Sequence, residues 1–178
     1  MVTQEQFNTI KEQVKQEFHD LIDGLSDEFL NMKEAYNPFI FSLEFEKILT
    51  TLHDFTKIDK RFTPTFKEVF RAFEECPYND LKLVILNNEP YNQINMADGI
   101  SFSCSKMTKP HPSLKFILED INNTVYSGNA VSTDKDLKRW SNQGILMLNV
   151  SLTAEINKPN QHHEIWKPFI AYLFDYFN

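Results

Sequence analysis

The sequence predicts an α/β fold, in which a short and mostly parallel sheet is joined by crossover helices and preceded by N-terminal helices. Downstream of Pro64, short apolar runs alternate with segments of helical periodicity, a pattern typical of parallel strands and their connecting helices. Upstream, the chain has only helical periodicity. We therefore expect a helical extension over residues 1–56 and one α/β domain over residues 57–178.

Bulk composition indicates a single intracellular domain. The chain has 178 residues, of which 42% are hydrophobic and 13% aromatic, enough to bury one core. No apolar run approaches the roughly 20 residues of a membrane-spanning helix, so no membrane partner is expected. The N-terminus has the pattern of neither a secretory signal nor a transit peptide. Cys76 and Cys104 lack metal-binding spacing, so we expect reduced thiols and no metal.

The net charge of -7 argues against tight, unaided binding to nucleic acid, because such proteins usually gather basic residues to neutralise phosphates. Local basic patches remain open as an alternative. Two groups could form them, although a solvated surface is the commoner explanation for so few charges: Lys106, Lys109 and Lys115, and Lys135, Lys138 and Arg139.

Two amphipathic helices are predicted in the N-terminal extension. The first has apolar residues three and four apart: Phe7, Ile10, Val14, Phe18, Leu21 and Ile22. We expect this helix to pack on its own domain rather than on a partner. The second covers about residues 43–55 and places four apolar residues on one side: Phe45, Ile48, Leu49 and Leu52.

The α/β domain begins with a predicted buried strand at residues 81–86, which a polar turn follows at residues 87–92. A short extended piece is predicted at residues 99–103. A helix then begins at Pro112, because proline suits the first helical turn. Residues 136–142 are also predicted to be helical.

Gly144 is a predicted helix cap, and the second strand follows it at residues 145–148. Asn149 comes directly after this strand. A last helix is predicted over residues 164–177. Open α/β sheets bind ligands beyond the carboxyl ends of their strands, so we expect a site where the two strands end.

Four residues near that edge could contact a planar ligand: Glu89, Tyr91, Phe102 and Asn149. An aromatic face can stack on a base, and a side-chain amide offers both a donor and an acceptor to a base edge. A carboxylate can orient water or stabilise positive charge. Spacing alone leaves a second explanation open, since aromatic residues in such loops often cap a core.

From about Phe62 to Phe177 the chain resembles family-one uracil-DNA glycosylases. The resemblance is carried by ordered segments: Pro64 with Val69 to Phe73; Leu81 to Leu86 followed by Glu89-Pro90-Tyr91; Gly99 to Ser103; Pro112-Ser113-Leu114; and Trp140, Gln143 to Asn149 and Leu152-Thr153. It implies a three-layer α/β/α fold that needs no metal and no cofactor. It also implies base flipping, in which a uridine leaves the DNA stack and enters a tight pocket.

The resemblance assigns roles to seven residues. Glu89 would be catalytic, and Pro112 and Ser113 would contact the DNA backbone. The base would be bound by Asn88, Tyr91, Phe102 and Asn149. Among these, Phe102 would stack on uracil, Asn149 would read its edge, and Tyr91 would exclude the thymine methyl group.

The chain departs from the family pattern in its first loop. The family has Gly-Gln-Asp-Pro-Tyr-His, whereas this chain has Asn87, Asn88, Glu89, Pro90, Tyr91 and Asn92. One extra methylene moves the carboxylate by about an ångström, which can cost on the order of a hundredfold in rate. Asn87 is expected to crowd a place where the family has glycine.

A second departure concerns the end of the family fold. Family members continue into a further strand and a His-Pro-Ser-Pro-Leu loop, and we expect this part to be absent here. His111, His162 and His163 do not occupy the missing position and are expected to be surface residues.

Three hypotheses follow. The preferred one is a glycosylase-like protein with a kept base pocket, weak or lost activity, and a binding or assembly role. The alternative is an active uracil-DNA glycosylase of base excision repair. The third, that the matched residues are only fold skeleton, predicts a pocket filled by side chains.

Weak binding to single- or double-stranded uracil-containing DNA is expected. A free last sheet edge and an apolar last helix predict a protein partner or oligomer. The richness in Asn, Lys, Ile and Phe suggests an AT-rich genome, and the divergent loop motif would suit a phage or virus.

Overall fold

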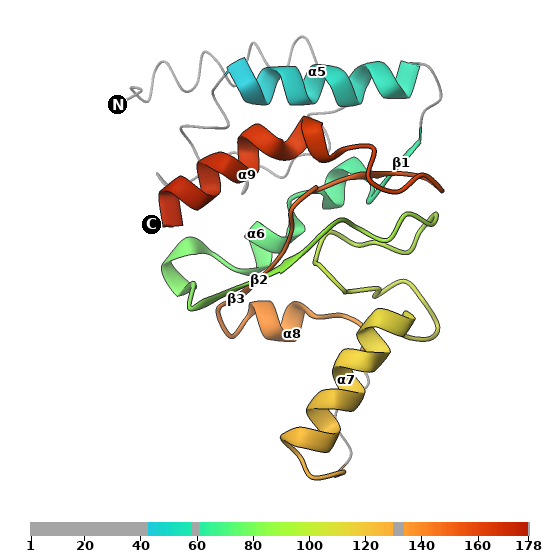
Figure 1. The fold of residues 1–178 in the computed structure, drawn as a ribbon, viewed down its shortest axis with the longest axis vertical. Helices are drawn as coiled ribbons and strands as arrows, with labels where there is room; N and C mark the ends of the chain where they lie inside the picture. The colour runs from blue at the N-terminus through green and yellow to red at the C-terminus, as the bar shows by residue number, and fades with distance from the viewer. Residues whose placement is uncertain (1–42, 58–60, 130–133, 178) are drawn as a thin grey trace.

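The computed structural model describes residues 43–57, 61–129 and 134–177, so the predicted first helix, around residues 7–22, lies outside the described residues. Figure 1 shows the arrangement of the described elements. They are α5 (Leu43–Lys57), β1 (Phe62–Thr63), the 3₁₀ turn Phe66–Glu68, α6 (Arg71–Glu75), the 3₁₀ turn Tyr78–Asp80, β2 (Leu83–Asn87), α7 (Pro112–Thr124), α8 (Lys138–Ser141), β3 (Ile145–Asn149), β4 (Ala154–Glu155) and α9 (His163–Phe177).

Two parallel strands form the centre of the molecule. β2 pairs with β3 in a register that runs from Leu83 opposite Ile145 to Asn87 opposite Asn149. The pairing of these two last residues means that both strands end at the same edge with an asparagine. A second, two-stranded sheet is antiparallel and joins β1 to β4. The parallel strands therefore set up a ligand edge of the kind expected from the sequence.

One face of the sheet is covered by α5, α6 and α9 (Figure 1). Successive strand residues point to opposite faces, so Leu146 and Leu148 of β3 face this layer while Met147 faces the other. The apolar stripe of α9 supplies Trp166, Phe169, Ile170 and Leu173, and α5 supplies Phe45, Ile48, Leu49 and Leu52. Helix α5 thus shares the core of the α/β part, and the division at residues 56 and 57 remains a prediction.

The other face is covered by α7, α8 and the segments that lead into them (Figure 1). A smaller core forms there from Ile100, Cys104, Leu114, Leu118, Leu137 and Met147. Helices on both faces of a short parallel sheet confirm the predicted α/β class. Helices α5, α7 and α9 begin within one residue of the positions expected from the sequence.

The prediction that the first strand is buried is wrong. Leu83 is 51% exposed and Leu86 is 44% exposed, whereas Leu146 and Leu148 of β3 are fully buried. Among the described residues, β2 pairs only with β3, so its other edge is free. The sequence predicted a free sheet edge, and within the described residues the outer edge of β2 is such an edge. On its far side, β3 accepts a hydrogen bond from the Ser101 amide to the Met147 carbonyl, at 3.0 Å.

Residues 99–103 also differ from the expected extended piece. Gly99 and Phe102 have left-handed backbone conformations, with φ of 92° and 62°. The chain changes direction at both residues, so it cannot continue as a strand. Only the Ser101 amide bonds to β3, so no ladder forms. The consequence is a turn that projects Phe102 beyond the sheet edge.

Across the described segments, every helix is too short or too polar to traverse a lipid bilayer.

Candidate functional site

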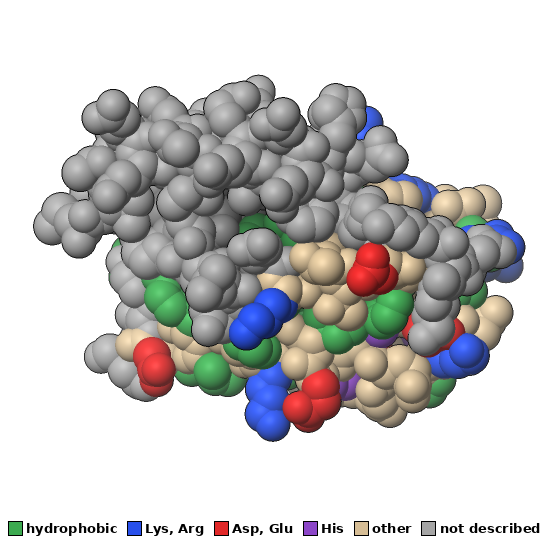
Figure 2. Space-filling model, turned by 90° about the horizontal axis from the view of Figure 1, so that it is seen from above, with side chains coloured by type: hydrophobic (Ala, Val, Ile, Leu, Met, Phe, Trp, Pro, Cys, Tyr) green, Lys and Arg blue, Asp and Glu red, His purple; other side chains and the backbone are tan. Residues whose placement is uncertain are grey.

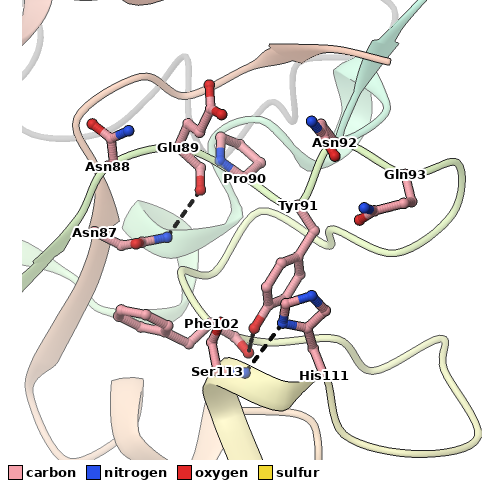
Figure 3. A pocket seen from close by; sticks show the side chains of 10 residues that line it. All are labelled: Asn87, Asn88, Glu89, Pro90, Tyr91, Asn92, Gln93, Phe102, His111 and Ser113. Carbon is pink, nitrogen blue, oxygen red and sulfur yellow. Dashed lines mark hydrogen bonds between the residues drawn. The ribbon is translucent and has the colours of Figure 1, made fainter. Parts of the chain in front are cut away.

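A pocket of about 250 Å³ lies beyond the carboxyl ends of β2 and β3. Figure 3 shows the side chains that line it, which come from the end of β2 and the loop after it, the turn around Phe102 and the start of α7. The lining residues are Asn87, Asn88, Glu89, Pro90, Tyr91, Asn92, Gln93, Phe102, His111 and Ser113. The pocket is open rather than filled by side chains, which argues against the hypothesis of a mere fold skeleton.

Tyr91 and Phe102 form the aromatic part of the wall. The Tyr91 hydroxyl donates a hydrogen bond to the Phe102 carbonyl oxygen, at 3.0 Å (Figure 3). Burial raises the pKa of Tyr91, so its hydroxyl stays protonated and remains a donor. Phe102 has a φ of 62°, which is uncommon for a bulky residue, and the bond to Tyr91 helps to hold it there.

His111 lies against Tyr91 at the mouth of α7. The two ring centroids are 4.0 Å apart and the ring planes make an angle of 38°. His111 also caps α7, because its Nδ1 accepts a hydrogen bond from the Ser113 amide at 3.3 Å. Burial lowers the pKa of His111, which keeps the ring neutral and Nδ1 able to accept.

The prediction that the three histidines are surface residues is wrong, because His162 is buried and His111 and His163 are half-buried. His162 is 1% exposed and contacts Thr153 through Nδ1 at 2.8 Å, and Trp166 donates to the same Thr153 hydroxyl at 2.7 Å. His111 lines the pocket. Its position just before Pro112 could have indicated a helix cap, since the residue before a proline at the first helical position is the place for one.

The Glu89 carboxylate points away from Tyr91, Phe102 and His111 (Figure 3). Its Oε2 accepts a hydrogen bond from the Asn160 amide at 2.8 Å and lies 4.0 Å from His163 Nε2. The neighbouring Asn88 side chain donates to the Asn160 side-chain oxygen at 3.0 Å. The segment before α9 therefore holds the carboxylate at the rim of the pocket.

Asn149 lies behind Asn87 rather than among the lining residues. It is 5% exposed, and its Oδ1 accepts a hydrogen bond from Asn87 Nδ2 at 2.9 Å. The same Asn87 nitrogen donates to the Glu89 backbone carbonyl, also at 2.9 Å. The asparagine that was expected only to crowd the site thus links the loop to the end of β3.

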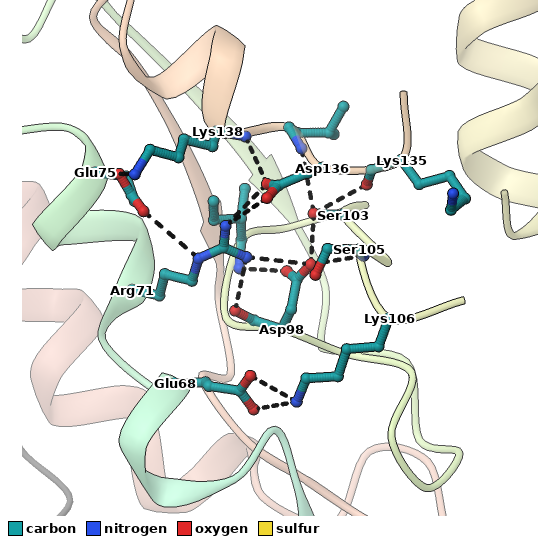
Figure 4. A network of polar contacts seen from close by, with 12 residues as sticks. Glu68, Arg71, Glu75, Asp98, Ser103, Ser105, Lys106, Lys135, Asp136 and Lys138 are labelled. Carbon is teal, nitrogen blue, oxygen red and sulfur yellow. Dashed lines mark hydrogen bonds and ion pairs between the residues drawn. The ribbon is translucent and has the colours of Figure 1, made fainter. Parts of the chain in front are cut away.

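A polar network supports the turn that carries Phe102 (Figure 4). Asp98 is 1% exposed and accepts hydrogen bonds from the Ser103 hydroxyl at 2.7 Å and from the Ser105 amide at 2.8 Å. The Asp98 carboxylate also forms an ion pair with Arg71, in which Arg71 Nη1 lies 3.2 Å from Asp98 Oδ2. Arg71 also binds both carboxylate oxygens of Asp136 at 2.9 Å. Composition and spacing gave no signal for this network, because its members are far apart in sequence.

The structure brings together most of the residues singled out from the sequence. Five of them line one pocket: Asn88, Glu89, Tyr91, Phe102 and Ser113. Pro112 is exposed at the start of α7, beside the pocket, and Asn149 is buried next to it. In the part of the chain that is described, no group of three or more His, Cys, Asp or Glu side chains is arranged to hold a metal ion.

In the described part of the chain, four of the six basic side chains in the two candidate groups lie beside carboxylates. Lys106 pairs with Glu68, Lys115 with Glu119, Lys138 with Glu75 and Arg139 with Asp134. On the face shown in Figure 2, described acidic and basic side chains are interspersed. The two candidate basic groups are therefore partly neutralised by neighbouring carboxylates.

No family model matches the chain, but individual relatives do. A curated uracil-DNA glycosylase of Amoebophilus asiaticus is 34% identical over 145 residues, which are 79% of this chain and 64% of the relative. A uracil-DNA glycosylase of Acinetobacter baylyi is 32% identical over 168 residues, 93% of this chain and 69% of the relative. The chain spans about two thirds of the length of these relatives.

Solved structures give the same fold. The crystal structure of the mimivirus uracil-DNA glycosylase has a TM-score of 0.76 at 24% identity and covers 91% of this chain and 61% of its own. A variant of the mimivirus protein in complex with UGI has a TM-score of 0.75 at 25% identity, covering 91% and 62%. The enzyme from Nitratifractor salsuginis is more distant, with a TM-score of 0.58 at 14% identity, covering 91% and 75%.

Proposed function

Because this chain belongs to the uracil-DNA glycosylase family, we propose that it recognises a uracil rotated out of DNA and hydrolyses the glycosidic bond slowly. One observation carries the proposal above all others. The open pocket of about 250 Å³ lies at the carboxyl ends of the parallel strands and is walled by Tyr91 and Phe102. This volume is below that of drug-sized ligand sites and suits a single base.

Each wall has a role in this proposal. Phe102 stacks on the face of the base, an interaction worth about 1–3 kcal/mol. Tyr91 stands where a methyl group at position 5 would lie, and its bond to the Phe102 carbonyl makes it a rigid barrier to thymine. Asn149 reads the base edge and Asn88 contributes from the loop after β2.

The chemistry is carried by Glu89. Cleavage develops positive charge on the sugar and negative charge on the departing base, so a carboxylate near the sugar lowers the barrier and orients water. Glu89 Oε2 accepts a hydrogen bond from the Asn160 amide at 2.8 Å, and the side chain points away from Tyr91 and Phe102. This orientation supports slow rather than efficient turnover.

DNA is proposed to contact the start of α7, where Pro112 and Ser113 lie beside the pocket. A helix N-terminus favours a phosphate group because its amides and dipole both attract negative charge. The ion pairs of Lys106 with Glu68 and of Lys115 with Glu119 support weak binding, since both lysines are partly neutralised before a phosphate arrives.

A second candidate function is binding without catalysis, in an assembly with another protein or a second copy. Two observations favour it: the anchored Glu89 carboxylate, and the free edge of β2 with Leu83 and Leu86 exposed. Exposed strand edges and apolar side chains are normally covered by a partner. Light scattering at working concentration tests the oligomer, and a monomer would argue against self-association.

The deciding experiment measures uracil release from single-stranded DNA that contains uracil. Wild type is compared with Glu89→Gln, which removes the charge, with Glu89→Asp, which keeps a shorter carboxylate, and with Asn149→Ala. We expect slow release by wild type and a loss of about a hundredfold or more in Glu89→Gln. No release by wild type, at protein concentrations equal to the DNA, would refute catalysis. Preferential binding of uracil-containing over thymine-containing DNA would then support the second candidate.

A further inference from the structure

A chain of hydrogen bonds fixes which atom of each asparagine amide points where. The backbone carbonyl of Glu89 can only accept, so the Asn87 atom that faces it at 2.9 Å must be the donor Nδ2. The same Nδ2 faces Asn149 at 2.9 Å, so the Asn149 atom there must be the acceptor Oδ1. The orientation of the Asn149 amide therefore follows from a backbone group that cannot rotate.

Reversing the Asn149 amide would be unfavourable. Its Nδ2 would then face the Nδ2 of Asn87, which places two donors against each other and loses a hydrogen bond. Asn87 cannot compensate by rotating as well, because its own oxygen would then face the Glu89 carbonyl. Asn149 is 5% exposed, so water has little access to satisfy a reversed amide.

Orientation matters because uracil and cytosine differ on this edge. Uracil offers a donor at N3–H and an acceptor at O4, while cytosine offers an acceptor at N3 and a donor at its 4-amino group. A primary amide can pair with either base if it rotates by half a turn, which exchanges its donor and its acceptor. An amide held in one orientation pairs well with only one of them.

We propose that Asn87 is a specificity-determining residue that holds Asn149 in the orientation that binds uracil, and thereby makes the pocket reject cytosine. This inference rests on the proposed function in that Asn149 reads the base edge. In this chain the loop supplies a side chain for the task, since Asn87 reaches both the Glu89 carbonyl and Asn149. Asn87 lines the pocket and bonds to the buried Asn149 behind it, so it connects the pocket wall to the amide that it holds.

The test compares how tightly the full chain binds free uracil and free cytosine, measured by ligand-observed NMR titration. Asn87→Ala removes the lock, which is the hydrogen bond from Asn87 that holds the Asn149 amide. It should lower the ratio of uracil to cytosine affinity by roughly tenfold to a hundredfold. Asn87→Asp has no side-chain N–H, so it should accept from Asn149 and reverse the amide, shifting the ratio further toward cytosine. Asn123→Ala is the control, because it removes an exposed asparagine side chain of α7 that does not line the pocket. Its ratio should stay within about twofold of wild type.

The outcomes separate this inference from the proposed activity. A ratio unchanged by both Asn87→Ala and Asn87→Asp overturns the lock, even if wild type releases uracil from DNA. Equal binding of the two bases by wild type, or binding of neither, overturns it as well. A ratio of uracil to cytosine affinity that falls in both variants supports the lock. This result stands even if the protein does not cleave DNA, and in that case only the catalytic proposal fails. Thermal unfolding of each variant shows whether it is folded, and either variant suffices if the other does not fold.

Discussion

The Tyr91 hydroxyl donates a hydrogen bond of 3.0 Å to the backbone carbonyl of Phe102, so the two aromatic walls of the pocket are fixed to each other across eleven residues of chain. Phe102 has a left-handed backbone conformation, which for a bulky residue costs on the order of 1–3 kcal/mol and persists only when its surroundings enforce it. The aromatic walls of the pocket are therefore held in place by a contact within the protein itself.

Removing the hydroxyl tests this relationship. Tyr91→Phe keeps the ring but leaves the Phe102 carbonyl without its donor, so we expect a loss of about 0.5–1.5 kcal/mol in the free energy of unfolding, measured in urea. Uracil affinity should fall severalfold because Phe102 is less well held. Tyr126→Phe, at a half-exposed tyrosine, is the control and should leave both values unchanged. Equal effects of the two substitutions would contradict the role of this bond.

Asp98 is predicted to hold the Phe102 turn through its buried carboxylate. Asp98→Asn weakens the pair with Arg71 and removes an acceptor from Ser103 or Ser105, so roughly 2–4 kcal/mol of stability should be lost. Asp136→Asn changes the other carboxylate on Arg71, but its side chain is 33% exposed, and we expect at most about 1 kcal/mol. Chemical unfolding of the two variants compares the free energy of unfolding that each one loses. A larger loss for Asp136→Asn would be inconsistent with the assignment.

His111 predicts a loss of stability in mild acid. Burial lowers its pKa below the ordinary value of 6.5, so the unfolded chain binds a proton more readily than the folded chain. The contribution of His111 is therefore complete above about pH 6.5 and is lost as the pH falls through the lower, folded pKa. Protonation also stops Nδ1 from accepting the Ser113 amide.

The measurement for His111 is the unfolding free energy between pH 5 and 8. His111→Asn can still cap the helix but does not titrate, so it removes one component of the pH dependence while the other histidines still contribute. As the pH falls from 6.5, the wild type should lose unfolding free energy relative to the variant, so the value for the variant minus that for wild type should increase. A constant difference over this range would contradict the prediction.

Two glycines allow strain to be separated from steric overlap. Gly99 and Gly128 both have positive φ, 92° and 82°, but a Cβ at Gly99 would overlap the Glu68 carbonyl oxygen, whereas one at Gly128 meets nothing within 4 Å. Gly128→Ala should cost about 1–2 kcal/mol from backbone strain alone. Gly99→Ala should cost clearly more, about 3 kcal/mol or above, and should displace the Phe102 turn. Similar unfolding midpoints for the two variants would rule out the close approach of Gly99 to Glu68.

Local patterns in the sequence were sufficient for the elements that bury a regular stripe. The spacing of Phe45, Ile48, Leu49 and Leu52 predicted α5, and Pro112 predicted the start of α7, because helical period and proline geometry are properties of neighbouring residues. The ends of the two strands also followed from the sequence, since each strand is an apolar run closed by a polar residue. This was enough to expect Tyr91, Phe102 and Asn149 near one edge.

Tertiary structure alone decided the orientation of the polar groups at that edge. Sequence spacing cannot tell that Glu89 turns toward Asn160, seventy-one positions away, or that Asn87 donates to Asn149 across sixty-two. It also could not place Asp98 against Arg71 or expose Leu83 and Leu86, which depend on which strand lies at the edge. The physical reason is that hydrogen bonds act over about 3 Å in space and take no account of distance along the chain, so the fold must exist before its polar partners can be known.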